Sequence, residues 1–369
     1  MRLAMQHKKP DRVPVMCQLS EGYLLRNGGE EPFDMCFSPE GFARALFRVR
    51  RELGFDGILL NTMFEENWRE TYDNCTVEQA ANGLRYILPS GERYRVWDHQ
   101  MIQENDRLTR DDLPDIEEID EENLPIRLDY SDATVLHKIA VEQGNKEQFS
   151  VHGEIWSPLD WLCVLFGMQQ AMMALVLDAE KCERILQQYV KQCIAFAKAQ
   201  IDVGVDAMKI SSPFAGAGFL SLPFYRRFVM PFESEVVREL HQYASDIPVY
   251  LHTCGSIGDR LELMAQSGID GLECMDPPPL GNVELADAKK RVGGKLFLKG
   301  NMDSVNVLLN ATPESLEEYV KTMLRDGAPG GGYILSSACS VAPGVKPEIL
   351  KMLVPLAEMY GRYDDNGKA

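Results

Sequence analysis

The segment Tyr250-Leu251-His252-Thr253-Cys254-Gly255 is a short apolar run that ends on a His-x-Cys pair and a glycine. In a β-strand every second side chain lies on the same face, so His252 and Cys254 can point together beyond the end of the strand. A second apolar run, residues 332–338, ends at Cys339. One imidazole and two thiolates suit zinc better than other common metal ions. The pattern predicts strand ends that present three zinc ligands.

Around this segment, short apolar runs alternate with amphipathic helical patterns. Strands are predicted at residues 13–19, 57–60, 148–152, 206–210, 249–252, 271–274, 295–299 and 333–336. Helices are predicted at residues 39–53, 179–202, 222–243, 258–266, 284–292, 313–326 and 347–360. This alternation is typical of parallel strands joined by helical crossovers.

Eight such strands predict an α/β fold, a (β/α)8 TIM barrel, with residues 1–369 as one domain. A barrel places its active site at the carboxyl ends of its strands. A doubly wound open sheet is the alternative, but no Gly-x-Gly-x-x-Gly motif follows the first predicted strand.

Residues 62–100 interrupt the alternation. Turn signals at Asn82-Gly83 and Ser90-Gly91 flank two runs, residues 84–88 and 94–97, with β-forming side chains. They predict a β-hairpin insertion above the barrel mouth.

Composition narrows the possible functions. The chain has 369 residues, of which 45% are hydrophobic and 25% charged, and a formal net charge of −18. Such a charge argues against nucleic acid or an anionic membrane as the main partner. The amino terminus has no signal-peptide pattern, and no apolar run approaches the roughly 18 residues of a membrane span. We therefore expect a cytoplasmic protein. Nine scattered cysteines argue against a disulfide framework.

Zinc prefers four ligands, and a catalytic site leaves one position for water or substrate. Glu273 ends the strand that follows the one carrying His252, and we expect it to be the fourth protein ligand; the alternative is that it supports the ligands from behind. Cys274, its neighbour, is expected to point the other way. The three-residue pattern also has a structural interpretation, a hydrogen-bonded histidine and two buried thiols.

Further polar and aromatic residues follow the predicted strands, where a barrel gathers its functional groups. Any one of them could instead cap a turn or pack. The expected catalytic residues are Glu154 and Asp303, and the expected substrate-binding residues are His152, Trp156, Lys209 and Asn301.

Several of these segments resemble the uroporphyrinogen decarboxylase-like superfamily, especially its zinc-dependent corrinoid methyltransferase branch. The resemblance covers most of the chain. It is carried by Pro10-Asp11-Arg12-Val13-Pro14-Val15, His252-Thr253-Cys254-Gly255, Gly268-Ile269-Asp270-Gly271, Lys299-Gly300-Asn301-Met302-Asp303 and Cys339 before Val341-Ala342-Pro343-Gly344.

The resemblance implies a barrel in which His252, Cys254 and Cys339 hold Zn²⁺. It also implies methyl transfer with a corrinoid (cobalamin) carried by a separate protein that docks at the barrel mouth, because this chain has no Asp-x-His-x-x-Gly corrinoid-binding motif. The small substrate is expected to be a methoxylated aromatic compound, as in O-demethylation, or otherwise a thiol such as coenzyme M.

Two other functions stay open. Decarboxylases of this superfamily carry an arginine-rich motif near the amino terminus, whereas residues 18–26 contain only Arg26 and add Glu21. A tetrapyrrole with many carboxylates needs a basic cleft, so this departure favours methyl transfer over decarboxylation. The third possibility is a non-catalytic, zinc-stabilised binding protein, which would have a closed site with four protein ligands.

Overall fold

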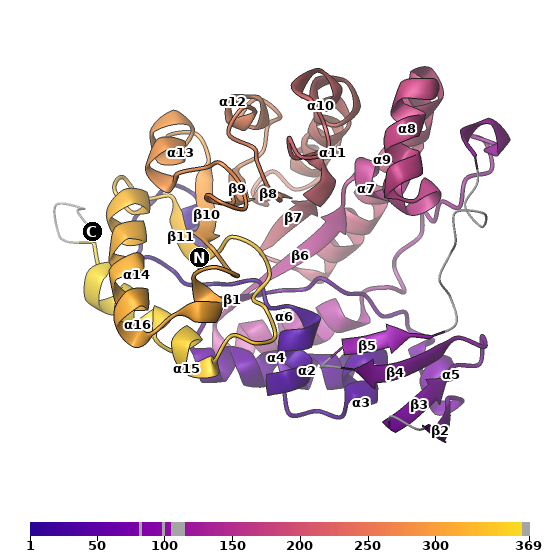
Figure 1. Ribbon diagram of the computed structural model, residues 1–369, viewed down its shortest axis with the longest axis horizontal. Helices are drawn as coiled ribbons and strands as arrows, with labels where there is room; N and C mark the ends of the chain where they lie inside the picture. The colour runs from indigo at the N-terminus through magenta and orange to yellow at the C-terminus, as the bar shows by residue number, and fades with distance from the viewer. Residues whose placement is uncertain (81–82, 98–99, 105–114, 364–369) are drawn as a thin grey trace.

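A computed structural model describes residues 1–80, 83–97, 100–104 and 115–363, and its centre is a parallel β-sheet (Figure 1). Seven strands follow one another in the order β1-β6-β7-β8-β9-β10-β11. They span Gly57–Leu59 (β1), Ser150–Trp156 (β6), Ala207–Ser211 (β7), Val249–Thr253 (β8), Gly271–Cys274 (β9), Phe297–Met302 (β10) and Tyr333–Ser337 (β11). Each lies within a few residues of its predicted position.

The first predicted strand, residues 13–19, closes this sheet as an extended segment. The Met16 amide donates to the Leu335 carbonyl at 3.0 Å, and on the other side the Asp56 amide donates to the Val15 carbonyl at 2.9 Å. The segment makes isolated bridges with residues 335 and 341 rather than a regular ladder. Pro14 has no amide hydrogen, which limits regular pairing here. The predicted (β/α)8 barrel is thereby confirmed.

Helices cover the outside of the barrel. The α-helices span Arg2–Met5 (α1), Glu21–Asn27 (α2), Pro32–Phe37 (α3), Pro39–Leu53 (α4), Trp68–Asp73 (α5), Val135–Glu147 (α6), Pro158–Phe166 (α7), Met168–Leu177 (α8), Ala179–Val203 (α9), Leu222–Phe228 (α10), Met230–Tyr243 (α11), Leu261–Met264 (α12), Leu285–Arg291 (α13), Pro313–Gly327 (α14), Pro347–Leu350 (α15) and Leu353–Tyr360 (α16). Short 3₁₀ helices lie at Ile116–Glu118 (η2), Pro213–Ala215 (η3) and Leu308–Asn310 (η4).

Two predicted helices are each broken in two, and a proline lies at each break. The helix predicted over residues 222–243 divides into α10 and α11 next to Pro231, and the helix over 347–360 divides into α15 and α16 just before Pro355. Proline cannot donate the hydrogen bond to the carbonyl four residues earlier, so a continuous helix is lost there.

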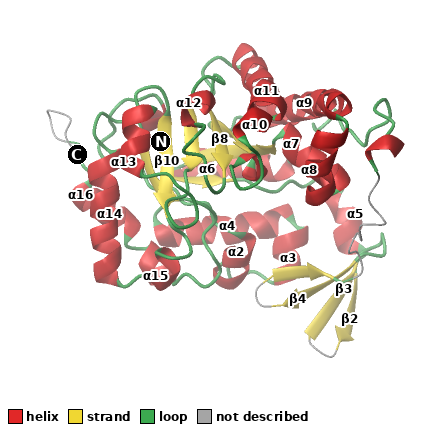
Figure 2. Ribbon diagram, turned by 45° about the horizontal axis from the view of Figure 1, so that its top comes forward, coloured by secondary structure: helices red, strands yellow, loops and turns green. Residues whose placement is uncertain are grey.

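The insertion is larger than the predicted hairpin. It forms a four-stranded antiparallel sheet of Thr76–Ala80 (β2), Gly83–Ile87 (β3), Arg93–Trp97 (β4) and Gln100–Gln103 (β5). Asn82, in the predicted turn, lies outside the described residues. Phe33 of α3 stacks on Tyr86 with ring centroids 4.8 Å apart, which fixes the small sheet to the barrel rim. Figure 2 shows it projecting beside α3.

Inward side chains fill the barrel in layers, because strands alternate their faces. We call the set farther from the carboxyl ends of the strands the lower layer; it consists of Met16, Leu59, Ala207, Tyr250, Phe297 and Ile334. Two residues further along the strands lies the charged layer: Glu154, Lys209, His252, Glu273 and Lys299, all buried. The carboxyl ends of the strands follow, and they carry the candidate ligands.

No single helix of the described residues is long and apolar enough to cross a membrane. The pair α7 and α8 meets that test of length and composition only jointly, across a bend of 105°.

Candidate metal centre

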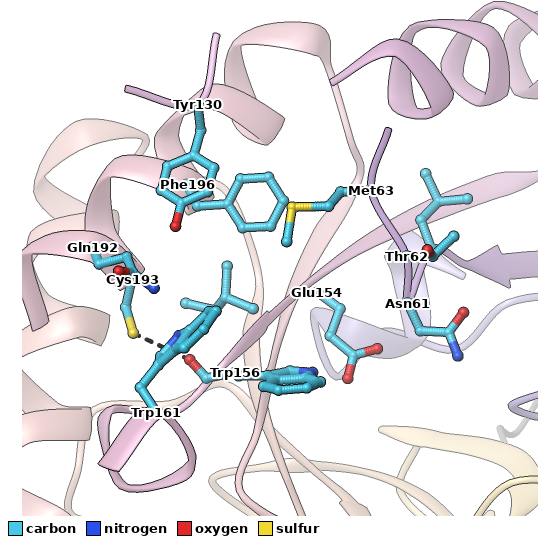
Figure 3. A pocket seen from close by; sticks show the side chains of 12 residues that line it. Asn61, Thr62, Met63, Tyr130, Glu154, Trp156, Trp161, Gln192, Cys193 and Phe196 are labelled. Carbon is cyan, nitrogen blue, oxygen red and sulfur yellow. Dashed lines mark hydrogen bonds between the residues drawn. The ribbon is translucent and has the colours of Figure 1, made fainter. Parts of the chain in front are cut away.

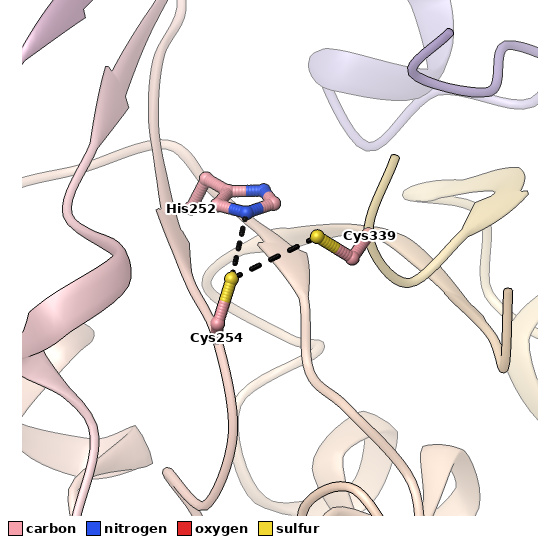
Figure 4. A group of neighbouring side chains, drawn as sticks. All are labelled: His252, Cys254 and Cys339. Carbon is pink, nitrogen blue, oxygen red and sulfur yellow. Dashed lines mark hydrogen bonds between the residues drawn. The ribbon is translucent and has the colours of Figure 1, made fainter. Parts of the chain in front are cut away.

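Of the three predicted zinc ligands, His252 lies in β8, Cys254 directly follows that strand, and Cys339 follows β11. His252 Nε2 lies 3.3 Å from Cys254 Sγ, which lies 3.8 Å from Cys339 Sγ. All three ligand atoms lie within 4.8 Å of one another, and Figure 4 shows them turned toward a common centre. Gly255 has φ +74°, a left-handed conformation that lets the chain turn away directly after Cys254.

These separations fit a tetrahedral zinc ion. A zinc–sulfur distance of about 2.3 Å and a zinc–nitrogen distance of about 2.0 Å place neighbouring ligand atoms about 3.5 to 3.8 Å apart. The observed distances of 3.3 and 3.8 Å lie close to that range. The donor set and its geometry therefore suit zinc without rearrangement of the strands.

Glu273 lies behind His252 rather than among the grouped ligand atoms, which favours the alternative that it supports the ligands. Its Oε2 lies 2.9 Å from His252 Nδ1, the ring nitrogen opposite the one that faces the sulfurs. Its Oε1 accepts a hydrogen bond from Lys299. The carboxylate instead accepts a hydrogen bond from Nδ1–H and orients the imidazole so that Nε2 faces the thiols, which is the supporting role that metal-binding histidines commonly receive.

The charged layer neutralises itself. Lys209 Nζ lies 3.2 Å from Glu154 and 3.6 Å from Glu273. Burial alone would raise the pKa of Glu273, but Lys299, Lys209 and His252 hold it well below its usual range. Burial likewise opposes the charge on Lys209, while Glu154 and Glu273 raise its pKa. If Lys209 contacts substrate as predicted, its ammonium group must either leave Glu154 and Glu273 or stay paired with them while it binds substrate.

Cys274 also faces this cluster, contrary to the expectation that it points the other way. Ligand atoms of Cys254, Cys274 and Asp276 lie within 4.8 Å of one another. Cys274 has φ +76° and Met275 φ +55°. Strand alternation ends where the backbone becomes left-handed, so sequence periodicity could not have found this thiol.

His152 does not reach the mouth. Its Nδ1 lies 2.9 Å from the Tyr250 hydroxyl and its Nε2 3.1 Å from the Ser150 hydroxyl, beside the lower layer. Burial lowers the pKa of His152 to about 3, so the ring is neutral. Strand β6 continues to Trp156, four residues beyond the predicted strand end, and this places the charged layer between His152 and the mouth. The structure therefore offers no support for the predicted substrate contact of His152.

Asn301 is hydrogen-bonded to the segment that follows β9, and Asp303 to the turn that follows it in the sequence. The Asn301 amide donates to the Met275 and Val283 carbonyls at 2.9 and 3.1 Å. Asp303 accepts hydrogen bonds from the backbone amides of Val305 and Asn306 at 2.9 and 2.7 Å. Both side chains are buried. Both side chains thus stabilise local backbone, and the structure adds no support for substrate binding by Asn301 or catalysis by Asp303.

Glu154 and Trp156 line a cavity of about 210 Å³ on the β1–β6 side of the mouth. Glu154 Oε2 is buried and has no hydrogen-bond partner among the described residues. Figure 3 shows Glu154 between Trp156 on one side and Asn61 on the other. The lining residues are Leu60, Asn61, Thr62, Met63, Tyr130, Glu154, Ile155, Trp156, Trp161, Gln192, Cys193 and Phe196.

Sequence reasoning missed most of this lining. Tyr130, Trp161 and Phe196 come from a loop, α7 and α9, which the chain brings together only in three dimensions. Their pattern in the sequence is that of ordinary packing residues. A second cavity, of about 410 Å³, lies on the other side of Trp156 against α7 and η3.

Comparisons with known proteins agree with this architecture. The family model described as uroporphyrinogen decarboxylase (URO-D) matches residues 1–360. A uroporphyrinogen decarboxylase of Legionella pneumophila (strain Lens) is 30% identical over 365 residues, which cover 95% of this chain and 94% of the relative. The methylcobamide:CoM methyltransferase MtbA of Methanosarcina acetivorans is 27% identical over 167 residues, which cover 45% of this chain and 46% of that protein.

The chain matches about half the length of several further relatives. Among solved structures, a methyltransferase from Methanosarcina mazei superposes with a TM-score of 0.71 and 18% sequence identity, over 97% of both chains. That superposition establishes a shared fold.

Proposed function

This chain belongs to the uroporphyrinogen decarboxylase family, and from that premise we propose that it is a zinc-dependent methyltransferase. Its small substrate is a methoxylated aromatic compound, and the second substrate is a corrinoid carried by a separate protein. The observation that carries the proposal is the cluster of His252, Cys254 and Cys339 at the barrel mouth, with ligand atoms spaced as zinc requires.

When bound there, zinc supplies a Lewis acid that withdraws electrons from the oxygen of the leaving group. In the transfer, the methyl carbon separates from the ether oxygen, and that bond's electron pair stays on oxygen, which takes a proton from water. The methyl carbon joins cobalt(I) of the corrinoid, whose electron pair forms the new bond. The products are a phenol and a methylated corrinoid.

The cavity beside Trp156 supports an aromatic substrate. Its rings offer stacking surfaces for a flat molecule, and aromatic pairs of this kind contribute about 0.5 to 1.5 kcal/mol each beyond burial. Glu154 Oε2, buried and without a partner among the described residues, can accept a hydrogen bond from a phenolic hydroxyl. A hydroxylated methoxybenzene combines both features.

The cavity also lies close to the candidate ligands. Lys209 bridges Glu154 and Glu273, and Glu273 contacts His252. One buried chain of charged contacts therefore joins the acceptor in the cavity to the imidazole of the metal centre. We assign Lys209 the role of holding these two carboxylates in place.

Decarboxylation is the second candidate, because the Legionella relative that matches almost the whole chain bears that name. A substrate with many carboxylates needs cations that are free to bind it. The fully buried cations of the described residues are Lys209, Arg260 and Lys299. The two lysines are paired with glutamates, and Arg260 donates to the Ala215 and Leu220 carbonyls. Arg26 is exposed. This arrangement favours methyl transfer.

Docking of the corrinoid protein would take place at the open end of the barrel, because the candidate ligands lie there and cobalt must reach the methyl group. This partner rests on the family resemblance and on the proposed reaction.

The test is a transfer assay with zinc-loaded protein and chemically reduced cobalamin. Methyl donors would be 2-methoxyphenol, methanol and methylamines, with coenzyme M and methylcobalamin testing the thiol reaction. We expect methylcobalamin and catechol from 2-methoxyphenol, and loss of both products in Cys339→Ser together with its zinc.

Cys182→Ser is the matched control, because Cys182 is a buried thiol of α9 away from the cluster. It should keep zinc and activity. If no methyl compound reacts while a porphyrinogen is decarboxylated, the proposal fails, and decarboxylation becomes the function of this protein. If zinc stays at one equivalent in Cys339→Ser, the ligand set is wrong.

A further inference from the structure

The sulfur atoms at the barrel mouth number three, one more than the expected ligand set contains. Cys274 is fully buried at the end of β9. Its ligand atom and those of Cys254 and Asp276 lie within 4.8 Å of one another. The Cys254 sulfur is thus shared by two groups of potential ligands, one with His252 and one with Cys274.

The local backbone is unusual at this thiol. Glu273 already faces the barrel interior, where it contacts His252, so a regular strand would turn Cys274 toward the outer helices. Instead, Cys274 and Met275 both have positive φ, at +76° and +55°. For residues other than glycine such conformations cost about 1 kcal/mol or more each, and they concentrate at functional sites.

The neighbouring strand leaves room for this conformation. Gly300 of β10 lies against the backbone of Cys274, and a Cβ atom at position 300 would stand 2.7 Å from the Cys274 carbonyl oxygen. Any larger residue at position 300 would therefore push against the turn that carries the thiol. The two strands together set the direction of the Cys274 side chain.

We propose that the Cys274 side chain turns toward a zinc ion held by His252, Cys254 and Cys339 and is its fourth ligand before substrate binds. The resting centre is then a set of one histidine and three cysteines, and the substrate opens it by displacing the Cys274 sulfur. This inference rests on the proposed function, because it takes zinc as the resident metal. In the exchange, the Cys274 sulfur departs with its electron pair and takes a proton from water, and the incoming donor atom brings its own pair.

Other residues are less able to fill this position. Glu273 is engaged by Lys299 and His252 on its two oxygens. Asp276 accepts a hydrogen bond from the Gly255 amide at 2.7 Å through Oδ2, while its buried Oδ1 has no partner among the described residues. Asp276 could therefore offer one oxygen, but zinc prefers thiolate donors when they are within reach. An oxygen ligand is the outcome that would contradict the proposal.

Closure by Cys274 has a chemical consequence. Zinc with four protein ligands has no open position, so water is kept from the metal until substrate arrives. The displaceable thiol thus distinguishes this centre from a purely structural one, in which no ligand exchanges.

X-ray absorption at the zinc edge tests the ligand count on the intact, zinc-loaded protein without a catalytic assay. Zinc–sulfur distances of about 2.3 Å are separable from zinc–nitrogen or zinc–oxygen distances of about 2.0 to 2.1 Å. We expect three sulfurs and one nitrogen in the unmodified protein and two sulfurs in Cys274→Ser. Cys182→Ser, which removes a remote buried thiol, should keep three.

The unmodified protein gives a decisive result even where Cys274→Ser does not fold. Two sulfurs with an oxygen donor would overturn the role of Cys274 and leave the proposed function intact. A protein that takes up no zinc would overturn both. Addition of 2-methoxyphenol to the unmodified protein should lower the sulfur count from three to two; an unchanged count of three would overturn the displacement.

Discussion

The lower layer and the charged layer are built by the same strands, two residues apart, and they differ in almost every physical property. Tyr250 and His252 both point inward from β8, and Phe297 and Lys299 both point inward from β10. The lower layer consists of apolar and aromatic side chains. The charged layer places two lysines and two glutamates out of water.

The two histidines show what this difference means. His152 is bonded to two hydroxyl groups, and burial lowers its pKa to about 3. His252 is equally buried, but its hydrogen bonds to Cys254, Cys339 and Glu273 outweigh burial and Lys209 and raise its pKa. Burial alone therefore does not decide whether a histidine is protonated, because the hydrogen-bond partners around the ring also shift its pKa. We infer that the lower layer holds the barrel together and that the charged layer holds the metal centre in place.

The largest effect is expected where the charge balance is broken. Glu273→Gln leaves Lys299 buried without its carboxylate, and breaking a buried pair by removing one partner costs about 3 to 5 kcal/mol. The same change weakens the support of His252, for which losses of about 10- to 100-fold in metal affinity are typical. Urea unfolding and competition for zinc with a chelator measure the two effects.

Glu233→Gln is the matched control, because Glu233 of α11 is also buried but has no ion-pair partner among the described residues. Burial raises its pKa to about 8, so it is mostly neutral at pH 7 and resembles glutamine. We expect a change below about 1 kcal/mol. Equal losses in the two variants would show that burial of a glutamate, rather than charge balance, decides stability.

A smaller, pH-dependent effect is expected at His152, which lies beside the lower layer and bonds to its Tyr250. The pKa of His152 is about 3 in the folded protein against 6.5 as its ordinary value. The folded state therefore binds fewer protons, and the contribution of His152 is present above pH 6.5 and lost as the pH falls from there toward 3. Between pH 7.5 and pH 5.0 this loss amounts to about 2 kcal/mol.

His152→Phe should remove that part of the pH dependence. Urea unfolding at the two pH values should show a decrease that is smaller by about 2 kcal/mol than in the unmodified protein. His137, whose pKa burial lowers to about 4, is present in both proteins, so its contribution cancels. An identical decrease in both proteins would mean that His152 is protonated in the folded state. Zinc content should not change.

The sequence predicted the barrel and the proximity of the three candidate ligands for the same reason. Strand periodicity places His252 and Cys254 on one face, and closure of the barrel brings Cys339 to the same end. At three predicted site residues the local backbone departs from a simple strand end. Strand β6 is longer than its apolar run, which lowers His152, and loops use the side chains of Asn301 and Asp303.

The direction in which a side chain points was harder to predict than the strand that carries it. Glu273 was expected to face the mouth and does face inward, but it reaches the opposite nitrogen of His252. Cys274 was expected to face outward, and the left-handed backbone turns it inward. Neither the tautomer of a histidine nor a positive φ at a cysteine has a signal in residue spacing. The aromatic cavity also depends on contacts between distant segments.

The smallest effect is expected at the open edge of the charged layer, where side chains are exposed. Trp156 is 47% exposed and lines both cavities, so Trp156→Leu should leave the unfolding free energy nearly unchanged. Loss of one stacking ring should weaken binding of 2-methoxyphenol by about 0.5 to 1.4 kcal/mol, or about two- to tenfold. Fluorescence of Trp161, which lines the same cavity and lies with its ring 5.5 Å from that of Trp156, provides the titration signal.

Phe297→Leu is the counterpart in the lower layer and should lower stability without changing that affinity. If Phe297→Leu weakened binding as much as Trp156→Leu, the division of labour between the two layers would be refuted.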